Sequence, residues 1–273
     1  MREPIRVMEL AQAGNHSRAA SLGSSIIERI TFSEPEVAAW KARLDLAPEL
    51  SSKYVELLSA DEYARAQRFR CNRERRRYVV ARAILRVLLA SYLDVRPNAI
   101  TFGYTQTGKP FIVNPATGLN FNVSHSAARA LYAFSYDCHV GVDIEYLHQD
   151  CDYTRVAALF FSDRERGALQ RLPRYQHKRM FFTYWTLKEA LVKAMGFGLS
   201  ALTQFELTLT QDQVPHVVNL PAAAGWGSDW ALRSVDAEAG YIAAIAITRL
   251  HSRRVIGGGG AHASEPTLRQ YDQ

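Results

Sequence analysis

Two long segments with helical periodicity constrain the fold of this 273-residue chain more than any other feature. Apolar residues recur at helical spacing over residues 72–93 and again over residues 176–195, which predicts a long helix in each half of the chain. Shorter stretches of alternating polar and apolar residues accompany both segments, and such alternation favours strands. Each half therefore combines helices with a small sheet, which predicts an α+β chain of two comparable lobes that meet near residue 147.

The two ends of the chain differ in composition from the part between them. Residues 1–30 are mixed, small and polar, and we expect a flexible leader there. Four glycines at residues 257–260 introduce a polar tail, and we expect residues 251–273 to be disordered. These boundaries leave an N-terminal lobe over residues 31–147 and a C-terminal lobe over residues 148–250.

The overall charge indicates the kind of partner that the protein binds, and the cysteines indicate the cellular compartment. A formal charge of +6 and a pI of about 9.3 favour an anionic partner, such as nucleic acid, an acidic protein or a polyphosphate. The three cysteines show no C-x-x-C spacing, so they suit neither a disulfide framework nor a zinc site and indicate a reducing compartment. The sequence shows no secretory signal and no apolar stretch long enough for a bilayer, so we expect a soluble, cytoplasmic protein.

A pair of carboxylates stands inside the apolar run Gly-Val-Asp-Ile-Glu. Asp143 and Glu145 are two residues apart, so on a strand both side chains leave the same face. Such a pair at a cleft suits Mg²⁺, which proteins hold by few carboxylates while substrate phosphates and water supply the other ligands. The alternative is the solvent face of an ordinary strand, although aspartate is disfavoured in strand interiors.

A third carboxylate lies in the second long helical segment, in Trp-Thr-Leu-Lys-Glu. Trp185, Glu189 and Lys193 form one stripe at i, i+4 spacing. The pair of charges could be a surface ion pair worth about 0.3 kcal/mol. The many aromatic residues around it favour a buried helix instead, and buried charges need a partner or a metal. Three carboxylates and an ammonium group suit Mg²⁺ on a diphosphate, which indicates phosphoryl-group chemistry.

Three further features have both a structural and a functional interpretation. His125 stands between two serines at the end of a predicted strand. Its side chain could donate a hydrogen bond to a phosphate, or it could be a structural histidine. A Ser-His nucleophile pair is excluded, because the side chains of adjacent residues on a strand point in opposite directions. Gly-Lys-Pro at residues 108–110 is a turn in most proteins and is not a phosphate loop. The arginines over residues 65–86 form either a solvated helix face or an anion clamp.

The order of these motifs carries more information than any one of them. An arginine-rich helix is followed by Gly-Lys-Pro, Phe-Asn-Val-Ser-His-Ser, Gly-Val-Asp-Ile-Glu and Trp-Thr-Leu-Lys-Glu-Ala-Leu-Val-Lys. Over about residues 37–250 the chain resembles the 4′-phosphopantetheinyl transferases, specifically the larger surfactin-synthetase-activating type. The resemblance implies two similar lobes of helices on small antiparallel sheets, related by a pseudo-twofold axis, with the active site in the cleft between them.

The resemblance also implies a reaction. Phosphopantetheine would pass from coenzyme A to a serine of an apo acyl or peptidyl carrier protein, with release of adenosine 3′,5′-bisphosphate. By that similarity Asp143, Glu145 and Glu189 are ligands of Mg²⁺, with Mn²⁺ as the alternative ion. Glu189, or a water beside it, would take the proton of the serine hydroxyl, and Lys193 would offset the charge that builds on the diphosphate.

The same resemblance implies contacts to coenzyme A. Lys109 matches a contact to the adenosine portion and His125 a contact to the 3′-phosphate. We add the neighbouring Pro110 and Ser124 and a clamp of three arginines: Arg65, Arg77 and Arg82. Two positions depart from the family pattern, because Glu62 stands where a basic residue is expected and Phe197 replaces a lysine that some members carry.

Two other functions compete with this interpretation. A metal-dependent hydrolase of nucleotide diphosphates would use the same carboxylates with water, but no Nudix-like box of clustered glutamates is present. A nucleic-acid-binding protein could be built on the arginine-rich helix, but no aromatic stacking motif accompanies it. As a transferase the chain is expected to be a monomer that serves acidic carrier proteins and binds neither nucleic acid nor membrane.

Overall fold

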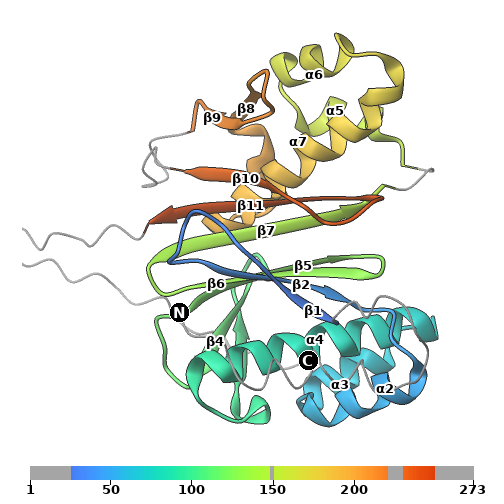
Figure 1. The fold of residues 1–273 in the computed structure, drawn as a ribbon, viewed down its shortest axis with the longest axis vertical. Helices are drawn as coiled ribbons and strands as arrows, with labels where there is room; N and C mark the ends of the chain where they lie inside the picture. The colour runs from blue at the N-terminus through green and yellow to red at the C-terminus, as the bar shows by residue number, and fades with distance from the viewer. Residues whose placement is uncertain (1–25, 148–150, 221–229, 250–273) are drawn as a thin grey trace, which may run out of the picture.

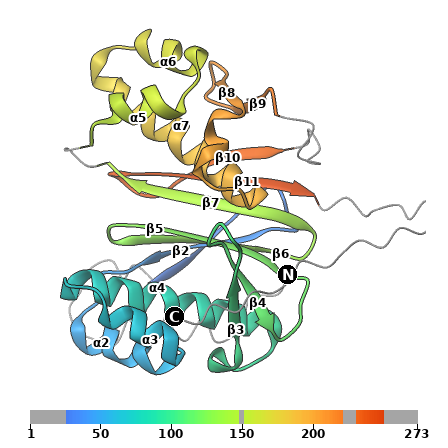
Figure 2. The same cartoon turned by 180° about the vertical axis from the view of Figure 1, so that it is seen from behind.

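The fold is known from a computed structural model that describes residues 26–147, 151–220 and 230–249. Two helical layers lie on the outside and small antiparallel sheets lie between them (Figure 1). The same layering is seen from behind (Figure 2). This architecture confirms the predicted α+β class.

The N-terminal half of the chain supplies one helical layer, two complete sheets and one strand of a third. Within it, α4 extends over the predicted residues 72–93. The elements in chain order are β1 Ile27–Ile30, β2 Ala38–Arg43, α2 Pro48–Lys53, η2 Tyr54–Leu57, α3 Ala60–Gln67, α4 Asn72–Leu93, η3 Pro97–Ala99, β3 Thr101–Tyr104, β4 Pro110–Asn114, β5 Asn120–Ser126, β6 Arg129–Ser135 and β7 Cys138–Tyr146.

The C-terminal half supplies the second helical layer and two further strand pairs. Its long helix begins two residues before the predicted start, because Pro173 can act as N-cap and does not interrupt the segment after it. The elements are α5 Tyr153–Phe160, α6 Asp163–Gln170, α7 Arg174–Met195, η4 Leu199–Thr203, β8 Glu206–Leu209, β9 Pro215–Val218, β10 Ala231–Val235 and β11 Tyr241–Arg249.

Two sheets meet at the centre of the molecule. One has the strand order β1-β2-β6-β5 and the other β10-β11-β7, and all described pairings are antiparallel. One apolar core forms where α4 covers the first sheet and a second where α7 covers the other. A third core lies between the sheets and contains Leu131, Val142 and Ile245. This third core joins the two lobes over a broad apolar face.

Two predicted boundaries differ from the structure. The leader was expected to reach residue 30, but Ile27–Ile30 forms β1, since Ile27 is buried and the strand pairs with β2. The predicted lobe boundary near residue 147 assigns β7 to the N-terminal lobe, but the backbone of β7 pairs with β11 over its whole length. Residues 1–25 and the predicted tail lie outside the described residues. None of the described helices is long and apolar enough to cross a membrane.

Candidate functional site

Strand β7 places the predicted pair of carboxylates on the face that meets α7. Val142 and Ile144 point into the core between the sheets, so the alternate residues Asp143 and Glu145 leave the opposite face. Gly141 shares that face, and a Cβ atom there would lie 2.0 Å from the carbonyl oxygen of Ala190. Glycine is therefore what allows the last turns of α7 to lie directly on β7.

This close approach brings the second motif to the first. The Nζ of Lys193 lies 2.6 Å from Oδ1 of Asp143 and 3.9 Å from Oε2 of Glu189. Desolvation is the largest single effect and lowers the pKa of Lys193, but the charge and hydrogen bond of Asp143, together with the charges of Glu189 and Glu145, outweigh it and the net pKa is raised. Carboxylates from β7 and α7 thus lie around one ammonium group.

The carboxylates are crowded and partly desolvated. Burial raises the pKa of Glu189 to about 7; Lys193 opposes the shift, while Asp143 and Glu145 add to it. Burial and then Asp143 raise the pKa of Glu145. One oxygen of Asp143, Oδ2, is buried and has no hydrogen-bond partner. Like charges held together in this way favour a bound cation in addition to Lys193.

These side chains fit a metal ion in their chemistry but are not gathered around one point. As the side chains lie, the described part of the chain contains no group of three or more His, Cys, Asp or Glu residues arranged to hold one ion. The ammonium of Lys193 reaches Asp143 and Glu189 instead. The donor chemistry nevertheless suits Mg²⁺, since the ligands are carboxylate oxygens, two of them have raised pKa values and the Oδ2 of Asp143 lacks a partner.

Strand β5 holds these carboxylates by side-chain hydrogen bonds. Ser124 donates to Oδ1 of Asp143 at 2.9 Å, and Ser126 donates to Oε2 of Glu145 at the same distance. Asn122 accepts the backbone N–H of Val142 at 2.9 Å. Alternate residues of β5 therefore face β7. Sequence reasoning treated Ser124 as a coenzyme contact and did not identify the other two; the two-residue alternation along the strand is the signal that could have found them.

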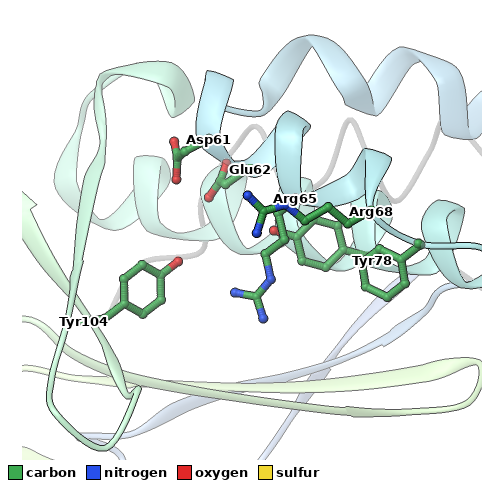
Figure 3. A pocket seen from close by; sticks show the side chains of 7 residues that line it. Asp61, Glu62, Arg65, Arg68, Tyr78 and Tyr104 are labelled. Atoms are coloured by element: carbon green, nitrogen blue, oxygen red, sulfur yellow. The ribbon is translucent and has the colours of Figure 1, made fainter. Parts of the chain in front are cut away.

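A pocket of about 580 Å³ opens beside α3, α4 and β3, a volume typical of small-molecule sites. Figure 3 shows the side chains that line it, with Tyr104 and Tyr78 on opposite sides. A second hollow, lined by Arg65, Arg82 and His125 among others, shares several of these residues. The first pocket is lined by Asp61, Glu62, Arg65, Arg68, Phe69, Tyr78 and Tyr104.

The predicted arginine clamp is only partly assembled at this pocket. Arg65 lies over the Tyr78 ring at 5.7 Å and forms no ion pair with a described carboxylate. Arg82 lines the hollow but is hydrogen-bonded to Glu62. Arg77 does not line the described pockets, because its guanidinium pairs with both oxygens of Asp45 at 2.7 Å.

His125 and Lys109 lie at the same hollows in different ways. His125 faces Arg65, on the opposite side of β5 from the serines, and burial lowers its pKa. Pro110 lines the hollow with it. Lys109 lines a neighbouring pocket together with Glu189 and Lys193, but its Nζ donates to the carbonyl oxygen of Lys193 at 2.7 Å. Burial lowers the pKa of Lys109 to about 8.

Comparison with known proteins identifies the family. Residues 139–246 match the 4′-phosphopantetheinyl transferase superfamily, and residues 46–135 match the 4′-phosphopantetheinyl transferase N-terminal domain. The chain belongs to the 4′-phosphopantetheinyl transferase superfamily. This finding confirms the resemblance inferred from the order of the motifs and makes the chain a transferase enzyme.

Two relatives in sequence agree with the family assignment, and a solved structure is also similar to part of the chain. The 4′-phosphopantetheinyl transferase HetI of a Nostoc species is 37% identical over 220 residues, which cover 80% of this chain and 90% of the relative. A 4′-phosphopantetheinyl transferase of Bacillus subtilis is 31% identical over 157 residues, covering 57% of this chain and 68% of the relative. A solved holo-[acyl-carrier-protein] synthase of Neisseria meningitidis matches with a TM-score of 0.33 and 19% identity, covering 40% of this chain and 95% of that chain.

Proposed function

We propose that this transferase moves phosphopantetheine from coenzyme A to a serine hydroxyl of an apo carrier protein, with Mg²⁺ held by Asp143, Glu145 and Glu189. The observation that carries the proposal is the meeting of carboxylates from β7 and α7 around Lys193, beside a buried carboxylate oxygen that lacks a partner. Mn²⁺ is the alternative ion, since it also prefers oxygen ligands.

The side chains suit the two events of the reaction. The serine oxygen bonds to the phosphorus of the phosphopantetheine group as the bond to the bridging oxygen of the diphosphate breaks. Glu189, with a pKa of about 7, takes the serine proton directly or through a water. Lys193 offsets the negative charge on the departing adenosine 3′,5′-bisphosphate. When bound, Mg²⁺ would neutralise and orient the diphosphate.

The pocket beside α3, together with the second hollow that shares its residues, is the proposed site for the adenosine end of coenzyme A. Arg65 and His125 provide donors for the 3′-phosphate, and the rings of Tyr78 and Tyr104 flank the space. Arg82 contributes less than predicted because Glu62 already balances its charge. Pro110 lines both this second hollow and the pocket that contains Glu189 and Lys193. The hollow and that pocket are therefore adjacent. We therefore propose adenosine in the second hollow and the diphosphate in the pocket of Glu189 and Lys193.

The carrier protein is proposed to be acidic, because a chain of net charge +6 attracts an anionic partner. Salt should therefore slow association with the carrier. We also propose that the enzyme acts as a monomer in the cytoplasm.

The proposal is tested with coenzyme A, Mg²⁺ and a panel of apo carrier proteins, with mass spectrometry of the carrier as the readout. We expect the mass of a phosphopantetheine group to be added to a carrier serine. Asp143→Ala and Glu189→Ala should each lower turnover by about two orders of magnitude or more, since each removes charge complementarity from the reacting diphosphate. Both variants should stay folded.

A matched control and two contrary outcomes complete the test. Asp137→Ala removes an exposed carboxylate next to the same strand and should leave turnover unchanged. Consumption of coenzyme A without any carrier would indicate the hydrolase. Near-normal turnover by Asp143→Ala or Glu189→Ala would show that the metal is held elsewhere.

A further inference from the structure

The tip of the β3–β4 hairpin is a preformed turn that leaves the N-terminal lobe. The backbone N–H of Thr105 donates to the carbonyl of Lys109, and that of Gly108 donates to the carbonyl of Thr105, both at 2.9 Å. The hydroxyl of Thr105 accepts the N–H of Lys109. Gly108 has a φ of 80°, which favours glycine. These contacts fix the direction in which the tip points without help from the other lobe.

The tip contacts the C-terminal end of α7, on the other side of the active site (Figure 2). Lys109 donates from Nζ to the carbonyl of Lys193 at 2.7 Å and more weakly to that of Ala194 at 3.4 Å. Thr107 donates from its hydroxyl to the carbonyl of Gly196 at 3.1 Å. Carbonyls at a helix C-terminus carry partial negative charge, so an ammonium group is favourable there. We call these three hydrogen bonds the hairpin clasp.

The clasp acts on the turn that carries the reactive side chains. Lys193 lies in the last turn of α7 and Glu189 one turn earlier. On one side, Gly141 lets the helix backbone lie against β7. On another, the clasp attaches the same turn to the N-terminal lobe, which carries the coenzyme pocket. The position of Glu189 and Lys193 relative to that pocket therefore depends on the hairpin.

The chemistry of Lys109 favours this role over direct contact with a phosphate. Its ammonium is partly desolvated, and its partners are backbone carbonyls rather than a described carboxylate. An ammonium group committed to two carbonyls is not free to bind an anion without releasing the helix.

We propose that Lys109 is a positioning residue: with Thr107, it holds the C-terminal turn of α7 so that Glu189 and Lys193 stay aligned with the coenzyme pocket. The kinetic consequence rests on the proposed function. The structural consequence does not, because the stability of the turn can be measured in the enzyme without substrates.

Amide hydrogen exchange of Lys109→Met tests the structural consequence. Methionine keeps the length of the side chain but cannot donate. We expect the amides of Gly196 and Phe197, which are hydrogen-bonded inside this turn, to exchange roughly tenfold faster, as loss of a charge-assisted hydrogen bond predicts. The amides of β6, in the core of the N-terminal lobe, should exchange at their original rate. Lys109→Arg retains a cationic donor and should restore most of the protection.

Binding and kinetics test how Lys109 acts. For Lys109→Met we expect the Kd of adenosine 3′,5′-bisphosphate to change by less than about threefold while kcat falls by about tenfold or more, since the turn that carries Glu189 is loosened. Thr107→Val removes one neutral hydrogen bond and should show smaller changes in the same direction. Lys53→Met, which removes an exposed lysine of α2, is the control and should change neither quantity.

Two results would overturn the proposal. A tenfold weaker Kd with unchanged exchange of the α7 amides would mean that the ammonium contacts the coenzyme directly. Unchanged exchange and unchanged kcat would mean that the clasp has no role. If Lys109→Met does not fold, the same two measurements on Thr107→Val decide the question. Failure of the carrier assay with the natural enzyme would instead count against the proposed function and leave the exchange result valid.

Discussion

The two lobes repeat one buried structure and use it differently. In each, a serine begins an eight-residue helix with a capping box, Ser59 before α3 and Ser162 before α6. The glutamate of each box is buried and pairs with a cation of the following 22-residue helix: Glu62 with Arg86 of α4, and Glu165 with Lys188 of α7. The two cations occupy equivalent places, fourteen residues after the first residue of their helices.

Both pairs are buried, and the difference lies in the partners of each glutamate. Both oxygens of Glu165 accept from Lys188, at 3.0 and 2.9 Å, and the backbone N–H groups of Ser162 and Leu207 complete the set. The carboxylate of Glu62 is shared between two arginines and borders the pocket. The shared frame is enclosed within the C-terminal lobe, whereas in the N-terminal lobe it also forms a wall of the pocket proposed to bind coenzyme A.

The two long helices differ in where they carry charged side chains: here it is the C-terminal lobe that has the additional polar groups. At the places in α4 that correspond to Glu189 and Lys193 of α7, the chain has Val87 and Ser91. The N-terminal helix therefore buries an apolar residue where the C-terminal helix presents a carboxylate to β7. A repeated fold need not repeat its chemistry, and here the proposed catalytic groups belong to one copy and the proposed coenzyme pocket to the other.

The largest stability effect should come from breaking the enclosed pair. Lys188→Met leaves Glu165 buried without its cation and should lower the free energy of unfolding by about 3–5 kcal/mol. Arg86→Met should cost less, because Arg82 remains as a second partner of Glu62. Denaturant unfolding of both variants measures the difference. Equal losses would mean that the second arginine beside Glu62 does not compensate for the loss of the first.

The sequence predicted much of the framework because its signals are local. The helix over residues 72–93 depends on apolar periodicity within one continuous segment. The two-residue spacing of Asp143 and Glu145 correctly placed both on one face of a strand. Contacts between distant segments carry no such signal. The pairing of β7 with β11, which moved the lobe boundary, depends on residues about 100 positions apart.

The same limit applies to the site. The ammonium of Lys109 donates to the end of a helix, and the guanidinium of Arg77 pairs with Asp45. Both interactions depend on tertiary contacts between segments that are distant in sequence. The residue types alone are equally suited to phosphate, so composition could not separate the two uses. Ser124 shows the reverse case, since its strand register could have assigned its side chain to Asp143 once β5 and β7 were known to be neighbours.

A smaller effect should appear as a difference in acid stability. Burial raises the pKa of Glu62, but Arg86 and Arg82 outweigh it and the net pKa is lowered from its ordinary value of 4.5. A carboxylate with a lowered folded-state pKa contributes stability that is fully present above pH 4.5 and is lost as pH falls below it. Glu62→Gln should therefore flatten the decline of the unfolding free energy below pH 4.5, in addition to lowering stability at neutral pH.

The control for the acid measurement is Glu56→Gln, which changes an exposed carboxylate of the same lobe and should leave the decline unchanged. Chemical denaturation at several pH values between about 3 and 6, a range that brackets the ordinary glutamate pKa, gives the unfolding free energy as a function of pH. A Glu62→Gln curve parallel to that of the natural protein would show that the two arginines do not hold the carboxylate ionised.

The smallest effect should be the same in both lobes. Ser59→Ala and Ser162→Ala each remove one side chain of a capping box, and each should lower the free energy of unfolding by about 1 kcal/mol. The glutamates of the boxes keep their cations in both variants, so the cost is limited to the helix N-terminus. If the losses of unfolding free energy in the two variants differ by much more than about 1 kcal/mol, the two capping boxes are not equivalent. The lobes would then share the path of the backbone but not its side-chain interactions. Equal costs, alongside unequal costs for Lys188→Met and Arg86→Met, would place the divergence of the lobes at the ion pairs and not in the helix frame around them.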